Sequence, residues 1–133
     1  MTATHTPGQT TETAHRAPQD FTQQVQQVDL DEECLGLLKE AAGNPSRRAA
    51  KTVSKNSSTT VTLLALSAGT EVKDHKAHGP AVLQTIRGEV SVLLEDRRLD
   101  LPPGRVVTLA SQVPHYLIAN VDSVVMLVVA SDR

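Results

Sequence analysis

The amino-acid sequence predicts an all-β domain, a sandwich or barrel of short strands, with one short helix on its N-terminal side. From residue 49 onward, apolar residues recur with a period of two, which is typical of half-buried strands. Turn-forming residues interrupt these segments at strand-length intervals. A run of apolar residues at helical spacing lies before these segments, between residues 29 and 43. For a chain of 133 residues, these observations favour one compact domain.

The N-terminal segment differs in composition from the rest of the chain. Residues 1–28 are rich in threonine, glutamine and proline and offer few apolar side chains to offset the entropy lost on ordering. We therefore expect residues 1–28 to form a disordered tail and residues 29–133 to form the folded domain.

The predicted helix begins with a capping pattern at Asp29. Asp29 can accept hydrogen bonds from first-turn amides, and Glu32 can reach back to the cap. The apolar residues that follow at helical spacing are Leu30, Cys34, Leu37, Leu38 and Ala41. Gly43, followed by Asn44 and Pro45, ends the pattern. Because Cys34 lies on the apolar face, we interpret it as a small buried side chain and not as a reactive thiol.

Eight strands are predicted after the helix. They are Ala49–Lys55, Thr59–Ser67, Val82–Arg87, Val90–Glu95, Arg98–Leu101, Val106–Ala110, His115–Asn120 and Val124–Ala130. The polar stretch from Glu71 to His78 is expected to be a loop between two of these strands.

The composition excludes several classes of function. One Phe, one Tyr and no Trp leave almost no aromatic surface on which bases could stack, and a net charge of −2 gives no basic footprint for nucleic acid. A single cysteine cannot form an intrachain disulfide. No apolar run reaches the length of a membrane span, and the first residues lack the apolar core of a secretory signal. We expect a cytoplasmic protein without nucleic-acid or membrane partners.

The longest apolar run, Val124–Ala130, shows no polar alternation. A strand of this kind is expected to be covered on both faces. Another element or a second copy of the chain would provide such a cover, and the sequence predicts a homodimer.

The chemistry of the domain must come from its histidines, because no nucleophile elbow, phosphate-binding loop or cysteine pair is visible. The predicted domain contains His75, His78 and His115. About forty residues separate His75 from His115 in sequence. A rolled sheet can still bring the two segments side by side.

The β region resembles the cupin family, of the small, single-domain bacterial type in the RmlC-like superfamily. The first cupin motif is written G-x5-H-x-H-x3,4-E-x6-G, and here Gly69, His75 and Gly88 keep its offsets. The second is written G-x5-P-x-G-x2-H-x3-N, and Gly104 and His115 match it. This resemblance implies a double-stranded β-helix, the cupin jelly-roll barrel.

The resemblance also implies a metal site, from which this chain departs. Metal-dependent cupins hold a divalent ion such as Zn, Mn, Fe or Ni with two or three histidines and one carboxylate. Ala77 and Ala81 stand at the second histidine and the glutamate positions. His78 lies one residue beyond Ala77 and could replace the missing ligand, which gives His75, His78 and His115 as candidate metal ligands.

Three functions remain open from the sequence. The first is a barrel pocket around His75 and His115, over an aliphatic floor that includes Leu83 and Leu117, that binds a small, partly apolar ligand. The second is a metal-dependent cupin enzyme of the isomerase, decarboxylase or dioxygenase type. The third is a partner-binding module whose tail carries the function. No catalytic residue is assigned.

Overall fold

The computed structural model describes residues 24–75 and 79–130. Within these ranges the chain forms helix α1 (Leu30–Gly43) and nine strands. The strands are β1 (Arg48–Lys55), β2 (Thr59–Leu66), β3 (Glu71–His75), β4 (Ala81–Arg87), β5 (Val90–Leu93), β6 (Arg98–Leu101), β7 (Val106–Leu109), β8 (His115–Ala119) and β9 (Ser123–Ala130). No helix in the described part of the chain is long and apolar enough to cross a membrane.

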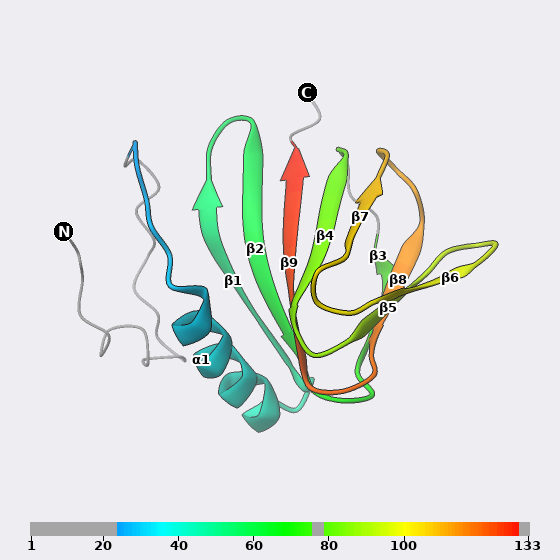
Figure 1. Ribbon diagram of the computed structural model, residues 1–133, viewed down its shortest axis with the longest axis horizontal. Helices are drawn as coiled ribbons and strands as arrows, with labels where there is room; N and C mark the ends of the chain where they lie inside the picture. Colours follow the sequence, from blue (N-terminus) through cyan, green and yellow to red (C-terminus); the bar gives the residue numbers. More distant parts are fainter. Residues whose placement is uncertain (1–23, 76–78, 131–133) are drawn as a thin grey trace.

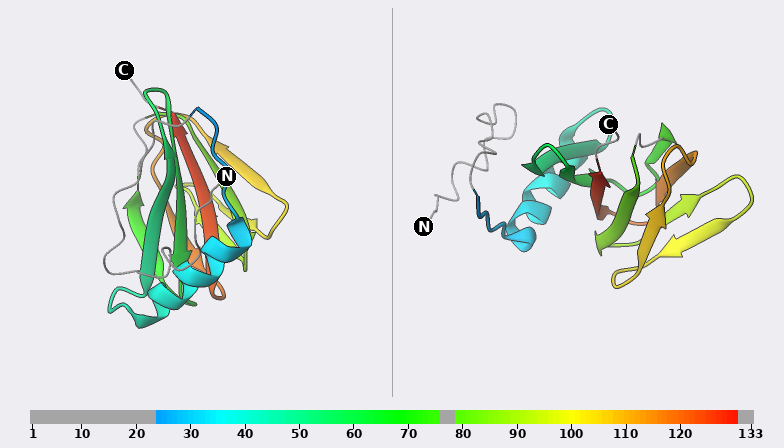
Figure 2. Two further views of the ribbon diagram at one scale, coloured as in Figure 1. Left: turned by 90° about the vertical axis from the view of Figure 1, so that its left-hand side faces the viewer. Right: turned by 90° about the horizontal axis from the view of Figure 1, so that it is seen from above.

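The strands form two antiparallel sheets. The five-stranded sheet has the order β1-β2-β9-β4-β7, and the four-stranded sheet has the order β3-β8-β5-β6. The two sheets face each other and roll together, with α1 on the outer side of the larger sheet (Figures 1 and 2). The predicted fold class, an all-β jelly-roll barrel with one short N-terminal helix, is confirmed.

The helix begins and ends where the sequence predicts. The Asp29 side chain accepts a hydrogen bond from the backbone N–H of Glu32 at 3.2 Å, which satisfies one of the first-turn donors. At the other end, the backbone N–H of Asn44 donates to the carbonyl of Ala41 at 3.2 Å. Both boundaries therefore arise from local hydrogen bonding that can be read from the residue types.

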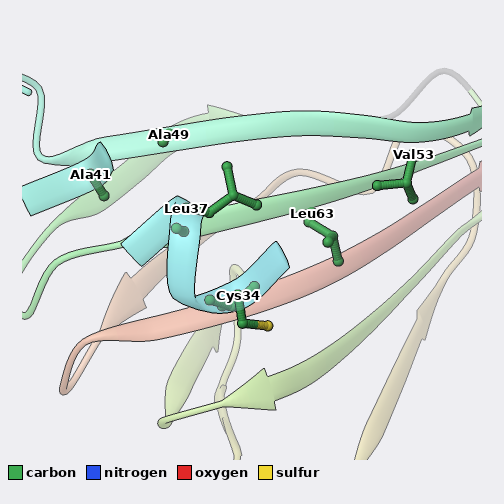
Figure 3. Close-up of a cluster of buried hydrophobic side chains, with 8 residues drawn as sticks. Cys34, Leu37, Ala41, Ala49, Val53 and Leu63 are labelled. Atoms are coloured by element: carbon green, nitrogen blue, oxygen red, sulfur yellow. The ribbon is translucent and has the colours of Figure 1, made fainter. Parts of the chain in front are cut away.

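One apolar cluster joins α1 to the outer face of the five-stranded sheet (Figure 3). Cys34, Leu37 and Ala41 from the helix pack against side chains of β1, β2 and β9, including Leu63 and Val124. Cys34 has no exposed surface, and burial raises the pKa of its thiol. The structure thus agrees with the interpretation of Cys34 as a small buried side chain.

Two ion pairs also connect α1 to the sheet. Lys51 Nζ lies 2.9 Å from Glu33 Oε2, with the two side chains 9% and 14% exposed. Arg87 Nη2 lies 2.8 Å from Asp31 Oδ1, but Asp31 is 85% exposed. The first pair lies in the interface between helix and sheet, and the second lies in solvent.

A second apolar cluster fills the space between the two sheets. Its members come from β4, β5, β6, β7, β8 and β9, and Leu83, Val92, Leu117 and Val125 are each at most 1% exposed. Burial of aliphatic side chains from both sheets is the main stabilising contribution to a fold of this kind.

The polar stretch at Glu71 is a strand, where the sequence predicted a loop. β3 pairs with β8, and Val72 lies opposite Leu117. β3 is an edge strand in the described part of the four-stranded sheet, so Glu71 and Lys73 are exposed. Edge strands tolerate charged residues, and this removes the apolar alternation by which a strand is recognised.

The apolar side chains at the start of β9 are covered by other elements of the same chain. β9 lies between β2 and β4 in the centre of the larger sheet. Val124 belongs to the cluster under α1, and Val125 belongs to the cluster between the sheets. The first part of β9 is covered on both faces, as predicted, but the outer cover is α1 of the same chain. Val128, further along, is partly exposed.

Candidate functional site

The candidate site lies where β3 ends and β8 begins. The register of these antiparallel neighbours pairs the backbone of His75 with that of His115. The register shifts between Val72 and His75, so three residues on β3 span the same length as two on β8. This irregularity decides which position of β3 lies beside His115. Figure 1 shows that β8 begins at the end of the barrel where β9 ends and β4 begins.

His115 is held in a fixed orientation. Its side chain is 4% exposed, and its Nδ1 lies 2.9 Å from the carbonyl oxygen of Val113. Because a carbonyl oxygen can only accept, Nδ1 carries the hydrogen of this bond. The lone pair of the neutral ring is then on Nε2, the nitrogen that would accept a hydrogen bond or bind a metal.

The surroundings of His115 are aliphatic. His115, Leu117 and Ala119 form the buried face of β8, while Tyr116 is 36% exposed on the opposite face. Leu83 and Leu117 are each 1% exposed and belong to the cluster between the sheets.

The end of the larger sheet is aliphatic as well. Ala81 pairs with Leu109 on β7 and with Val129 on β9. Val129 and Leu127 pack against the cluster between the sheets but stay partly exposed. His115 thus lies on the buried face of β8, and Leu117, the next residue on that face, belongs to the apolar cluster between the two sheets.

The described residues do not by themselves form a metal site. Among them, no three His, Cys, Asp or Glu side chains gather in the way that a bound ion requires. Of the three predicted ligands, His115 is described in full, His75 is described by its backbone alone, and His78 lies outside the described residues. The predicted set of His75, His78 and His115 stays a prediction.

A separate groove lies between β6 and β7, the edge strands of the two sheets. It has a volume of about 440 Å³, and its lining includes Arg98, Leu99, Asp100, Arg105 and Val107. A hydrogen bond from Ser91 lowers the pKa of Asp100, and a hydrogen bond from Arg98 lowers it further. Arg105 adds a smaller electrostatic contribution in the same direction.

Val113, Arg98 and Arg105 were not predicted as site residues from the sequence. Val113 acts through its backbone carbonyl, so its side chain gives no signal. The two arginines line one groove because edge strands of different sheets meet there. The visible signal was the turn Pro102-Pro103-Gly104, which separates the two strands from which the groove is built.

Comparison with known proteins gives structural neighbours alone. No family model and no curated protein matches the sequence. An RmlC-like cupin protein from Desulfovibrio desulfuricans superposes with a TM-score of 0.60 at 21% identity, over 65% of this chain and 85% of that chain. A conserved protein of unknown function from Streptococcus pyogenes gives a TM-score of 0.66 at 17% identity, over 86% of this chain and 94% of that chain.

A third structural neighbour is named as an enzyme. The DMSP lyase DddQ from Ruegeria pomeroyi superposes with a TM-score of 0.59 at 18% identity, over 64% of this chain. The match spans 47% of the lyase, so less than half of that protein is represented. Identities at this level show a shared fold and carry no function.

Proposed function

Because the chain has the cupin fold, we propose that the end of its barrel around His75 and His115 binds a small, partly apolar ligand. The observation that carries this proposal is the β3–β8 register, which pairs these two positions at one end of the smaller sheet. Facing residues of an antiparallel pair have their Cβ atoms about 4.5–5.5 Å apart on one face of a sheet. Two imidazoles at such positions could contact one ligand.

The chemistry around His115 supports a ligand with both polar and apolar parts. The ring is oriented by Val113, so Nε2 carries the lone pair that can accept a hydrogen bond from a hydroxyl or amide. Leu83 and Leu117 belong to the aliphatic floor, which suits a hydrocarbon portion. Ligand pockets in proteins commonly combine an apolar lining with a few convergent polar groups.

The test is a titration of ¹⁵N-labelled protein with a panel of small alcohols, amides and carboxylic acids, followed by amide chemical shifts. We expect a binding compound to shift the amides of Leu117 and His115, and the variant His115→Ala to abolish these shifts. Tyr116→Ala is the matched control, because Tyr116 is next in sequence but lies on the exposed face of β8. If both variants lose binding equally, or if no compound of the panel shifts the amides of β8, the proposal is contradicted.

The second candidate is a divalent-metal-dependent cupin enzyme. It is favoured by the pairing of two histidine positions at one end of the smaller sheet. It requires a third donor beyond those that the described residues provide, and His78 is the predicted one. Metal analysis of the untagged protein after incubation with Zn²⁺, Mn²⁺, Fe²⁺ or Ni²⁺ separates the two candidates. Retention of one ion per chain, lost in both His115→Ala and His78→Ala, would place the metal enzyme first.

A further inference from the structure

We propose that the groove between β6 and β7 is a second binding site, which takes a small monocarboxylate with an apolar body. It lies on the seam between the two sheets and uses none of the histidines. The proposal is independent of the ligand site at the end of the barrel.

The groove has an apolar floor and a basic rim. Leu99, Leu101 and Val107 line it and also belong to the cluster between the sheets or pack against it. Arg98 and Arg105 line it as well, and Asp100 is the acidic residue beside them. Two guanidinium groups and one carboxylate leave a local charge of about +1, which favours a ligand with a single negative charge over a phosphate or another polyanion.

A short turn sets the position of Arg105. In Pro102-Pro103-Gly104-Arg105, the backbone N–H of Arg105 donates to the carbonyl of Pro102 at 3.2 Å, and Gly104 has a φ of +95°. Proline followed by glycine at the two central positions is the pattern of a type II turn. Arg105 thus leaves a turn with little backbone freedom. Among the described residues, no ion pair to the Arg105 side chain is present.

A chain of hydrogen bonds sets the position of Arg98. Asn120 donates to Ser91 Oγ at 3.0 Å, and Ser91 Oγ donates to Asp100 Oδ1 at 2.8 Å. Arg98 then donates to the same Asp100 oxygen through Nε, at 3.0 Å. Ser91 has no exposed surface, so the chain is anchored in the fold. The bond to Asp100 uses the Nε of Arg98, and the Nη groups are the donors that a ligand carboxylate would take.

The position on the seam keeps the groove open. Within the described residues, β6 pairs with β5 and β7 pairs with β4, and neither pairs with the other. The volume of about 440 Å³ lies in the lower part of the range of about 300–1,000 Å³ for ligand pockets. A short aliphatic chain would fit such a volume with its carboxylate at the arginines.

The experiment is a titration of the ¹⁵N-labelled protein with hexanoate. We expect weak, saturable binding with amide shifts at Leu99, Leu101 and Val107. Hexanamide, which lacks the charge, and acetate, which lacks the apolar body, should each bind at least about fivefold more weakly. If hexanamide or acetate binds as tightly as hexanoate, the groove does not recognise a carboxylate together with an apolar body, and the proposal is wrong.

Two arginine variants locate the site. Arg105→Gln should weaken hexanoate binding about fivefold, the loss expected for one charge-assisted contact in a partly exposed groove. Arg97→Gln is the matched control, because Arg97 is an exposed neighbour of β6 that does not line the groove, and it should leave binding unchanged. An equal effect of both variants would show a general charge effect and contradict a site.

The variant His115→Ala separates this inference from the proposed function. Hexanoate shifts at β6 and β7 that persist in His115→Ala support the groove whatever the outcome at the barrel end. Shifts that occur at Leu117 and vanish in His115→Ala would place hexanoate at the barrel end and overturn the second site.

Discussion

The five glycines whose surroundings the structure describes differ in the space they leave for a side chain, and Gly88 has the least. It has a φ of +81°, and a Cβ at this position would collide with the carbonyl oxygen of Asp122 and with Ser123 Oγ. Ser123 Oγ in turn bonds to Glu89, by accepting from its N–H at 3.0 Å and donating to its carbonyl at 3.1 Å. The turn after β4 therefore packs against the turn before β9, and the absence of a side chain at residue 88 permits the contact.

We expect Gly88→Ala to lower the free energy of unfolding by about 3 kcal/mol, from the positive φ and the backbone collision together. Gly69→Ala is the control, because Gly69 has a similar φ of +84° but open space around its Cβ position. It should cost about 1 kcal/mol, from the backbone conformation alone. Urea denaturation measures both values, and equal losses would show that the collision is relieved at no cost.

At the scale of elements, one partly buried ion pair adds to the apolar cluster that attaches α1 to the sheet. Glu33→Gln leaves Lys51, which is 9% exposed, without its carboxylate partner. We expect a loss of about 2–3 kcal/mol in the free energy of unfolding, because an uncompensated charge remains in the interface. Asp31→Asn removes the solvent-exposed pair with Arg87 and should cost less than about 1 kcal/mol.

A double variant distinguishes burial of the charge from loss of the contact. Glu33→Leu together with Lys51→Met should recover most of the lost stability, since buried ion pairs can often be replaced by apolar residues of similar volume. Chemical denaturation of the single and double variants measures this. If the double variant is no more stable than Glu33→Gln, the charge left on Lys51 is not the cause of the loss.

The elements differ in how well sequence predicts them, for physical reasons. The helix was predictable because the cap at Asp29 and the apolar spacing of Leu37 and Ala41 are local. β3 was not, because the charged residues Glu71 and Lys73 are exposed at a sheet edge. The pairing of His75 with His115 depends on a register shift between strands that are distant in sequence, which residue spacing along one strand does not reveal.

At the scale of the whole molecule, part of the outer sheet face has no cover among the described residues. α1 lies over β1, β2 and β9, while Val82, Val106 and Val128 lie further along the same face. Val106 is 52% exposed. An apolar surface of this kind is typical of an interaction site, and the homodimer predicted from the sequence would use it.

We expect light scattering coupled to size exclusion to give the mass of a dimer, and Val106→Glu to give that of a monomer. Val121→Glu is the control, since Val121 is 49% exposed but lies in the turn before β9. It should leave the dimer intact. A monomer for the unmodified chain, or dissociation by both variants, would rule out this face as the interface.

The central place of β9 also affects the order in which the chain can fold during synthesis. β9 is the last of the described strands in chain order, yet it pairs along its length with β2 and with β4. Ribosomes add roughly 5–20 residues per second, so β2 and β4 wait several seconds with open hydrogen-bonding edges until β9 emerges. Unpaired strand edges favour association with other chains. Nascent chains of this protein are therefore most vulnerable to aggregation just before translation of β9, although α1 and the β1–β2 hairpin can already form from local contacts.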